Sequence, residues 1–142
     1  MLSNPSWRRI ALLGVLTIAA GCNSSLGVPS AVPVRGTVKF KGAPASGIRV
    51  TFHPQRGDGQ ERFLPIGETG ADGGFSLSTG EPNNGAPPGE YLVTFMKPEL
   101  SPTEIVETEI DAFQGKYSDP TTSPFRVTVV RGENVLPPFE LD

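Results

Sequence analysis

The stretch that decides the fold reads VPVRGTVKFKGAPASGIRVTF and spans residues 32–52. Apolar and polar residues alternate in it, with Val34 and Val38 before its centre and Phe52 at its end. A period of two is typical of β-strands that bury one face and expose the other. Lys41-Gly42-Ala43-Pro44 lies between the two alternating runs, and its Gly and Pro favour a tight turn. The stretch therefore predicts two strands joined by a hairpin-like connection.

The same alternation recurs along the chain as far as its last residues. In each run the apolar phase is expected to face the core. That phase consists of Val32, Val34, Val38, Phe40, Ile48, Val50, Phe52, Phe75, Leu77, Tyr91, Val93, Phe95, Phe125, Val127, Val129, Phe139 and Leu141.

Short turn segments separate these runs. They are Asp-Gly-Gly at residues 72–74, Pro-Pro-Gly at 87–89 and Arg-Gly-Glu-Asn at 131–134, which is expected to join the last pair of strands. With 17 Gly and 15 Pro, the composition is turn-rich. We therefore expect an all-β fold, a single antiparallel β-sandwich of about seven strands over residues 32–142.

Two regions give weaker signals. Residues 64–68 predict a further short strand. Within residues 98–124, the segment from Thr103 to Phe113 fits either a short helix or an edge strand, and the sequence leaves both open.

The first 21 residues have the pattern of a secretory signal peptide. Arg8 and Arg9 precede an apolar stretch from residue 10 to 20, which is short for a membrane span of about 20 residues. We therefore expect residues 1–21 to be removed on export. Residues 22–31, which are polar with Gly and Pro, are expected to form a lipidated flexible linker.

The end of that segment, Ala19-Ala20-Gly21-Cys22, resembles the lipobox of bacterial lipoproteins. The resemblance implies that Cys22 carries a thioether-linked diacylglycerol and becomes the new N-terminus. The sequence departs at Ala19, where the motif usually has Leu, Val or Ile. The resulting prediction is an exported lipoprotein of the cell envelope, held at the outer membrane or the periplasmic face. The alternatives are an ordinary cleavage site or an uncleaved anchor, with Cys22 incidental.

Four segments carry a second resemblance: Val34-x-Gly36-x-Val38, Gly42-x-Pro44-x-x-Gly47-x-x-Val50-x-Phe52, Thr69-Gly70-Ala71-Asp72-Gly73-x-Phe75-x-Leu77 and Gly89-x-Tyr91-x-Val93. They resemble the carboxypeptidase regulatory-like, transthyretin-like β-sandwich family, in the form found in small lipoproteins of planctomycete type. Gly70 stands where the family usually has Asp. The resemblance implies a fold and no activity, because these glycines form turns and the apolar residues form core.

The net charge and the candidate reactive residues limit the classes of function that the sequence supports. Without residues 1–21 the chain has 10 basic and 15 acidic residues, a net charge of −5, which excludes an electrostatic footprint for nucleic acid. His53 is the only histidine; it lies on the polar phase, and the expectation is an exposed strand-end residue rather than a catalytic or metal-binding one. Asp58-Gly59 and Asp72-Gly73 are read as turns rather than Ca²⁺ ligands, since the EF-hand spacing is absent. The acidic residues expected to form a solvated face are Glu104, Glu107, Glu109 and Asp111.

Binding surfaces are weakly marked. Arg35, Lys39, Lys41 and Arg49 are expected on one solvent-exposed sheet face. The sole tryptophan, Trp7, lies in the signal segment, which disfavours a sugar-binding aromatic platform. The resulting hypothesis is a non-catalytic, lipid-anchored β-sandwich without metal or cofactor, whose partners are the membrane and an unknown envelope protein or glycan. The alternatives are a carbohydrate- or peptide-binding accessory module and, from the enzyme class, a small hydrolase.

Overall fold

The computed structural model describes residues 30–55, 63–101 and 109–142. These residues form strands and turns, and no helix occurs among them. The strands are β1 (Val34–Phe40), β2 (Ala43–Pro44), β3 (Arg49–Pro54), β4 (Ile66–Glu68), β5 (Gly74–Ser76), β6 (Gly89–Met96), β7 (Pro98–Leu100), β8 (Glu109–Asp111), β9 (Arg126–Val129), β10 (Asn134–Val135) and β11 (Phe139–Leu141). The all-β fold predicted from the sequence is confirmed, with several strands of only two or three residues raising the number in this part of the chain to eleven.

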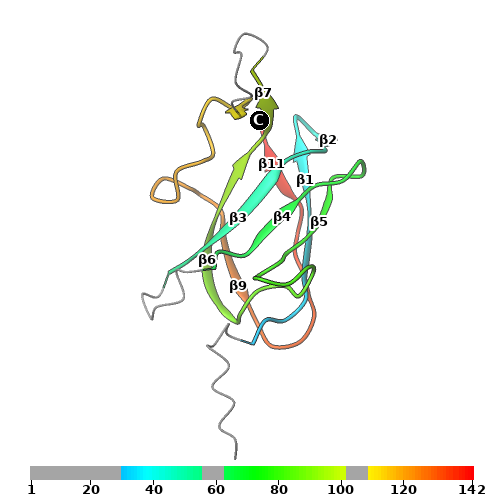
Figure 1. The fold of residues 1–142 in the computed structure, drawn as a ribbon, viewed down its shortest axis with the longest axis vertical. Helices are drawn as coiled ribbons and strands as arrows, with labels where there is room; N and C mark the ends of the chain where they lie inside the picture. Colours follow the sequence, from blue (N-terminus) through cyan, green and yellow to red (C-terminus); the bar gives the residue numbers. More distant parts are fainter. Residues whose placement is uncertain (1–29, 56–62, 102–108) are drawn as a thin grey trace, which may run out of the picture.

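Two sheets form the sandwich (Figure 1). In the first, β1 is central and pairs antiparallel with β2 and β5 along one side. The second has the order β4-β3-β6-β9 and is antiparallel throughout. In the first sheet, the side of β1 opposite to β2 and β5 pairs with β10 and β11, and both of these pairings are parallel. The antiparallel arrangement expected from the sequence is therefore mixed at this edge, because the last two strands run in the same direction as the first.

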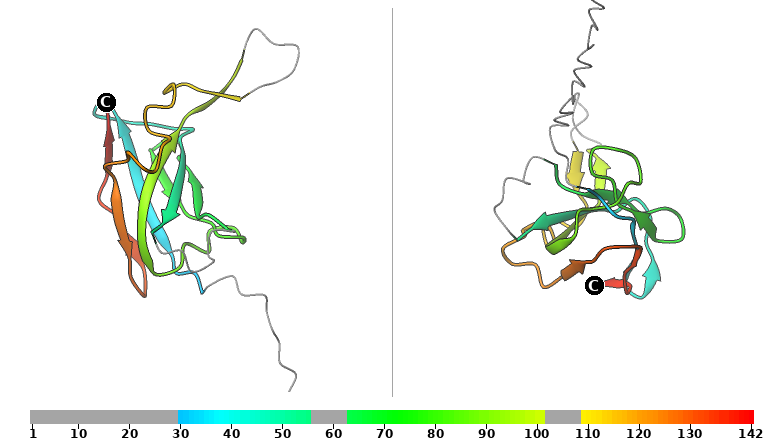
Figure 2. Two further views of the ribbon diagram at one scale, coloured as in Figure 1. Left: turned by 90° about the vertical axis from the view of Figure 1, so that its left-hand side faces the viewer. Right: turned by 90° about the horizontal axis from the view of Figure 1, so that it is seen from below.

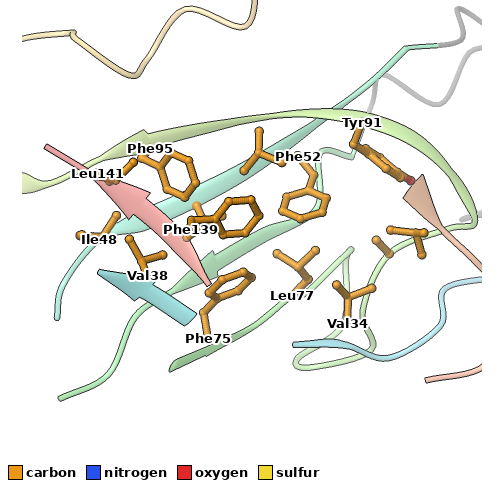
Figure 3. Packing of buried hydrophobic residues seen from close by; sticks show 14 residues of the cluster. Val34, Val38, Ile48, Phe52, Phe75, Leu77, Tyr91, Phe95, Phe139 and Leu141 are labelled. Carbon is orange, nitrogen blue, oxygen red and sulfur yellow. The ribbon is translucent and has the colours of Figure 1, made fainter. Parts of the chain in front are cut away.

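The core lies between the sheets and consists of the predicted apolar phase (Figure 3). Val32, Phe40, Phe125 and Val127 are partly buried and pack against it. Phe139 contacts Phe95 and Phe125 with interplanar angles of 61° and 86°, in the edge-to-face arrangement that aromatic pairs prefer. The fully or almost fully buried members are Val34, Val38, Ile48, Val50, Phe52, Phe75, Leu77, Ala86, Tyr91, Val93, Phe95, Val129, Phe139 and Leu141.

Two of the predicted turns do not join the pairs of strands that the sequence suggested. Lys41 and Gly42 both have positive φ, 52° and 78°, as the tightest hairpin turns require. They join β1 to the two-residue β2, and the chain then crosses to the other sheet, so the two runs within residues 32–52 are not paired with each other. The turn at residues 131–134 likewise connects β9 in one sheet to β10 in the other. Both corrections have one cause: turn chemistry fixes where a strand ends, whereas long-range contacts fix its partner.

Residues 98–101 and 109–118 settle part of the region that the sequence left open. β7 and β8 form an antiparallel hairpin that extends beyond the sandwich, at the end where the C-terminus lies (Figures 1 and 2). From Glu109 to Phe113 the chain is strand and turn, so the helix expected as one alternative does not occur there; residues 103–108 lie outside the described residues. The weaker strand expected at residues 64–68 is confirmed as β4.

Candidate functional site: an open groove on the sandwich surface

A broad hollow lies on the outer surface of strands β1, β4, β5 and β10. It has a volume of about 980 Å³ and is wide open to solvent. Its lining comes mostly from the outward phase of each strand, because the alternating inward residues fill the core. Between β4 and β5 the two sheets approach each other, with mutual backbone hydrogen bonds between Ile66 and Ser78. The groove is therefore a shallow surface bounded by packed strands rather than an enclosed cavity.

The groove has a mixed lining of polar and apolar groups. Thr37, Ser76 and Ser78 contribute hydroxyl groups, and Ser78 Oγ accepts a hydrogen bond from the backbone N–H of Asn83 at 2.8 Å. The other lining side chains are polar or charged in Asn83, Arg35, Arg49, Glu68 and Asp72, and apolar in Phe75, Ile66, Val135, Leu136 and Pro138. Such a surface can form both hydrogen bonds and apolar contacts with a bound chain.

Both arginines of the groove already have acidic partners. Arg35 pairs with Glu133, and Arg49 Nη1 lies 3.3 Å from Glu109 Oε2. The paired side chains are substantially exposed to solvent, and exposed pairs of this kind stabilise a fold by only about 0–1 kcal/mol. A ligand can therefore replace either partner at small energetic cost.

The basic face predicted from the sequence is divided between two sheets. Arg35 and Lys39 lie on β1, and Lys39 Nζ is 3.6 Å from Glu140. Lys41 lies in the following turn, with its Nζ 5.2 Å from the centre of the Phe40 ring. Arg49 belongs to β3 in the other sheet and meets Arg35 only across the groove. The expectation of one basic face is therefore wrong, since the chain changes sheets between β2 and β3.

His53 differs from its predicted environment. It is half-buried on β3, and its Nε2 forms a hydrogen bond with Thr94 Oγ1 on the neighbouring strand β6, at 2.8 Å. Burial lowers the pKa of its imidazole below the usual 6.5, because the charged form loses water. The expectation of an exposed residue is corrected, because a partner on β6 lies within reach. His53 is not among the residues that line the groove.

The four acidic residues expected to form one solvated face do not have a common environment. Glu104 and Glu107, like Asp58, lie outside the described residues. Asp111 is half-buried and accepts hydrogen bonds from the backbone N–H groups of Lys97, Phe113 and Gly115. It therefore organises the turn after β8 instead of lying on a solvated face.

Asp72 also acts locally. Its Oδ1 accepts a hydrogen bond from the N–H of Gly74 at 2.9 Å, and Gly73 has a positive φ of 76°, as the predicted turn requires. In the described part of the chain, no cluster of three or more His, Cys, Asp or Glu side chains is arranged to hold a metal ion.

The groove itself was not predicted from the sequence. Thr37 is an ordinary outward-phase residue of one segment, and Ser76 and Ser78 are outward-phase residues of another. A signal did exist in the alternation, which assigns all three to the solvent-facing side. Their assembly into one surface depends on the pairing of Thr37 with Gly74 and of Ile66 with Ser78, which the sequence does not specify.

Cys22, the predicted lipidation site, lies outside the described residues. Residues 30–55, 63–101 and 109–142 contain no helix that is long and apolar enough to cross a membrane. Comparison of the chain with family models, curated proteins and solved structures gave no significant match.

Proposed function

We propose that this protein is an exported, lipid-anchored cell-envelope protein, whose non-catalytic β-sandwich binds another envelope component through the groove. The observation that carries the binding role is the groove itself: a broad, open surface of about 980 Å³ with hydroxyl groups, apolar side chains and two weak ion pairs. Open surfaces with both polar and apolar groups suit recognition of a partner, whereas catalytic sites usually withdraw reacting groups from water.

A protein segment is the partner that the lining favours over a glycan. Ile66 and Val135 are exposed large apolar side chains at the groove, and both are suited to contact a partner's apolar side chains. Sugar binding usually relies on exposed aromatic rings. The only aromatic residue in the lining, Phe75, is just 5% exposed. A glycan-binding accessory module is therefore the less favoured alternative.

The anchor rests on the sequence pattern that ends at Cys22. The only cysteine of the chain follows directly after the apolar stretch, at the position where the lipobox requires it. A diacylglycerol contributes two acyl chains, and two chains hold a protein firmly at a membrane whereas one holds it weakly.

Site-specific photocrosslinking in living cells tests the binding role. A photoreactive amino acid is introduced at Thr37 in the groove and, as a matched control, at Thr128, which is exposed on β9 away from it. We expect discrete crosslinked protein species from Thr37 only, and their loss when Ser76→Arg fills the groove. The same crosslinks from both positions, or crosslinks that survive Ser76→Arg, would contradict the proposal.

A further inference from the structure

One end of the sandwich is where the described chain begins, and we name it the tether end. It comprises residues 30–34 and the turn between β9 and β10, and it lies opposite the end that holds the C-terminus (Figure 1). Hydrogen bonds fix the turn against the beginning of the chain. The N–H of Asn134 donates to the carbonyl of Pro33 at 2.9 Å, and the N–H of Val130 donates to Asn134 Oδ1 at 3.0 Å.

Two large apolar side chains are exposed at the tether end. Val130, directly after β9, is 57% exposed. Phe63 is 51% exposed and lines a hollow together with Ser30 and Ala31. Single exposed apolar residues are normal on protein surfaces. These two lie at the end where the chain joins its proposed anchor, so they can contact the surface to which the anchor holds the protein.

The length of the tether limits how far this end can move from the anchor. Eight residue steps separate Cys22 from Ser30, so the fully extended tether reaches at most about 29 Å. The eight residues of β6 alone extend over about 26 Å. Because the chain joins the sandwich at the tether end, this end stays within about 29 Å of the lipid, whereas the opposite end can lie farther away.

We infer that the tether end rests on the membrane surface, with Val130 and Phe63 in contact with lipid. This inference depends on the proposed anchor at Cys22. The chain after residue 21 has a net charge of −5, so a zwitterionic phospholipid surface fits better than an anionic one. In this orientation the groove runs along the side of the sandwich and remains open to a partner, and the β7–β8 hairpin is directed away from the lipid.

Depth-dependent fluorescence quenching tests this orientation. Residues 22–142 contain no tryptophan, so one introduced by Val130→Trp or Leu100→Trp is the only such reporter. The thiol of Cys22 is coupled to a maleimide lipid in phosphatidylcholine vesicles with brominated acyl chains, and circular dichroism first verifies the fold of each variant. Leu100 is the matched control, because it is 62% exposed but lies on β7 at the opposite end.

We expect several-fold stronger quenching of Val130→Trp than of Leu100→Trp, and the same result for Phe63→Trp as a second reporter. Equal quenching at both ends, stronger quenching of Leu100→Trp, or none at any position would overturn the inference. The chemical coupling supplies the tether, so the result does not depend on acylation in the cell. If mass spectrometry of the protein from cells shows acyl chains while Val130→Trp and Phe63→Trp remain unquenched, this inference alone is wrong. Absence of acyl chains in cells would instead contradict the proposed function.

Discussion

Phe75 and Gly36 should be energetically coupled, because the aromatic ring occupies the space that a side chain at the glycine would need. The two residues are directly opposite each other on β5 and β1. A Cβ added at Gly36 would lie 2.7 Å from Cζ of Phe75, closer than packed carbon atoms approach. The same ring also faces Gly67 on β4, whose added Cβ would lie 3.2 Å from Cδ2. The ring therefore packs where two strands lack side chains.

The magnitudes follow from this geometry. Phe75→Ala should lower the free energy of unfolding by about 3–5 kcal/mol, the usual cost of removing a buried phenyl ring. Gly36→Ala should cost about 1–3 kcal/mol, because it overfills a packed site. In the double variant the new methyl group enters the space that the ring has vacated, so the cost of Gly36→Ala should fall to about zero. The expected coupling energy is therefore about 1–3 kcal/mol.

Urea unfolding of residues 22–142, followed by circular dichroism, measures all four proteins of the cycle. Gly70→Ala is the matched control, since a Cβ there would meet nothing nearer than 3.6 Å, and it should be additive with Phe75→Ala. Phe75→Leu also removes Cζ and repeats the cycle if Phe75→Ala does not fold. Additivity of Gly36→Ala and the Phe75 substitution within about 0.5 kcal/mol would refute the packing argument.

Three further outcomes are expected. Cys22→Ala should move the protein from the membrane to the soluble fraction. The proposed anchor is contradicted if the variant still sediments with membranes and mass spectrometry of the wild-type protein detects no acyl chains. Tyr91→Phe removes the hydroxyl that donates to the carbonyl of Pro87 at 2.7 Å and should cost about 1 kcal/mol in urea unfolding; an unchanged midpoint would show that this bond contributes nothing. Because burial lowers the pKa of His53, the unfolded chain binds more protons below pH 6.5, so the free energy of unfolding should fall as the pH drops through that value. Unfolding of His53→Ala at several pH values should lack this component, and an identical pH dependence in both proteins would contradict it.

The inward-facing residues were predictable because burial follows a local rule. Val38, Phe75 and Tyr91 were assigned to the core from period-two alternation, and all three are buried. The partners of each strand were harder to predict, because strand pairing depends on contacts between residues far apart in the sequence. β1 ends at the expected turn, yet its partners include β11, about a hundred residues later.

The candidate site was predictable only in its parts. Arg35 and Arg49 were identified as solvent-facing, but their meeting across one groove depends on how the two sheets join at β4 and β5. The environment of His53 was missed for a related reason: Thr94 reaches it through the register of β3 with β6, which alternation along one strand cannot reveal.

The energetics of the groove favour binding over catalysis. A general acid or base acts best when burial or a fixed neighbour shifts its pKa toward the working pH. The histidine, whose pKa is shifted by burial, forms its hydrogen bond with Thr94 and does not line the groove. The basic groups that do line it, Arg35 and Arg49, belong to exposed ion pairs that are weak in water. A partner can exchange with Glu133 or Glu109 at little cost, and the hydroxyl groups that also line the groove can then fix its position. These properties suit the proposed reversible recognition of a protein segment.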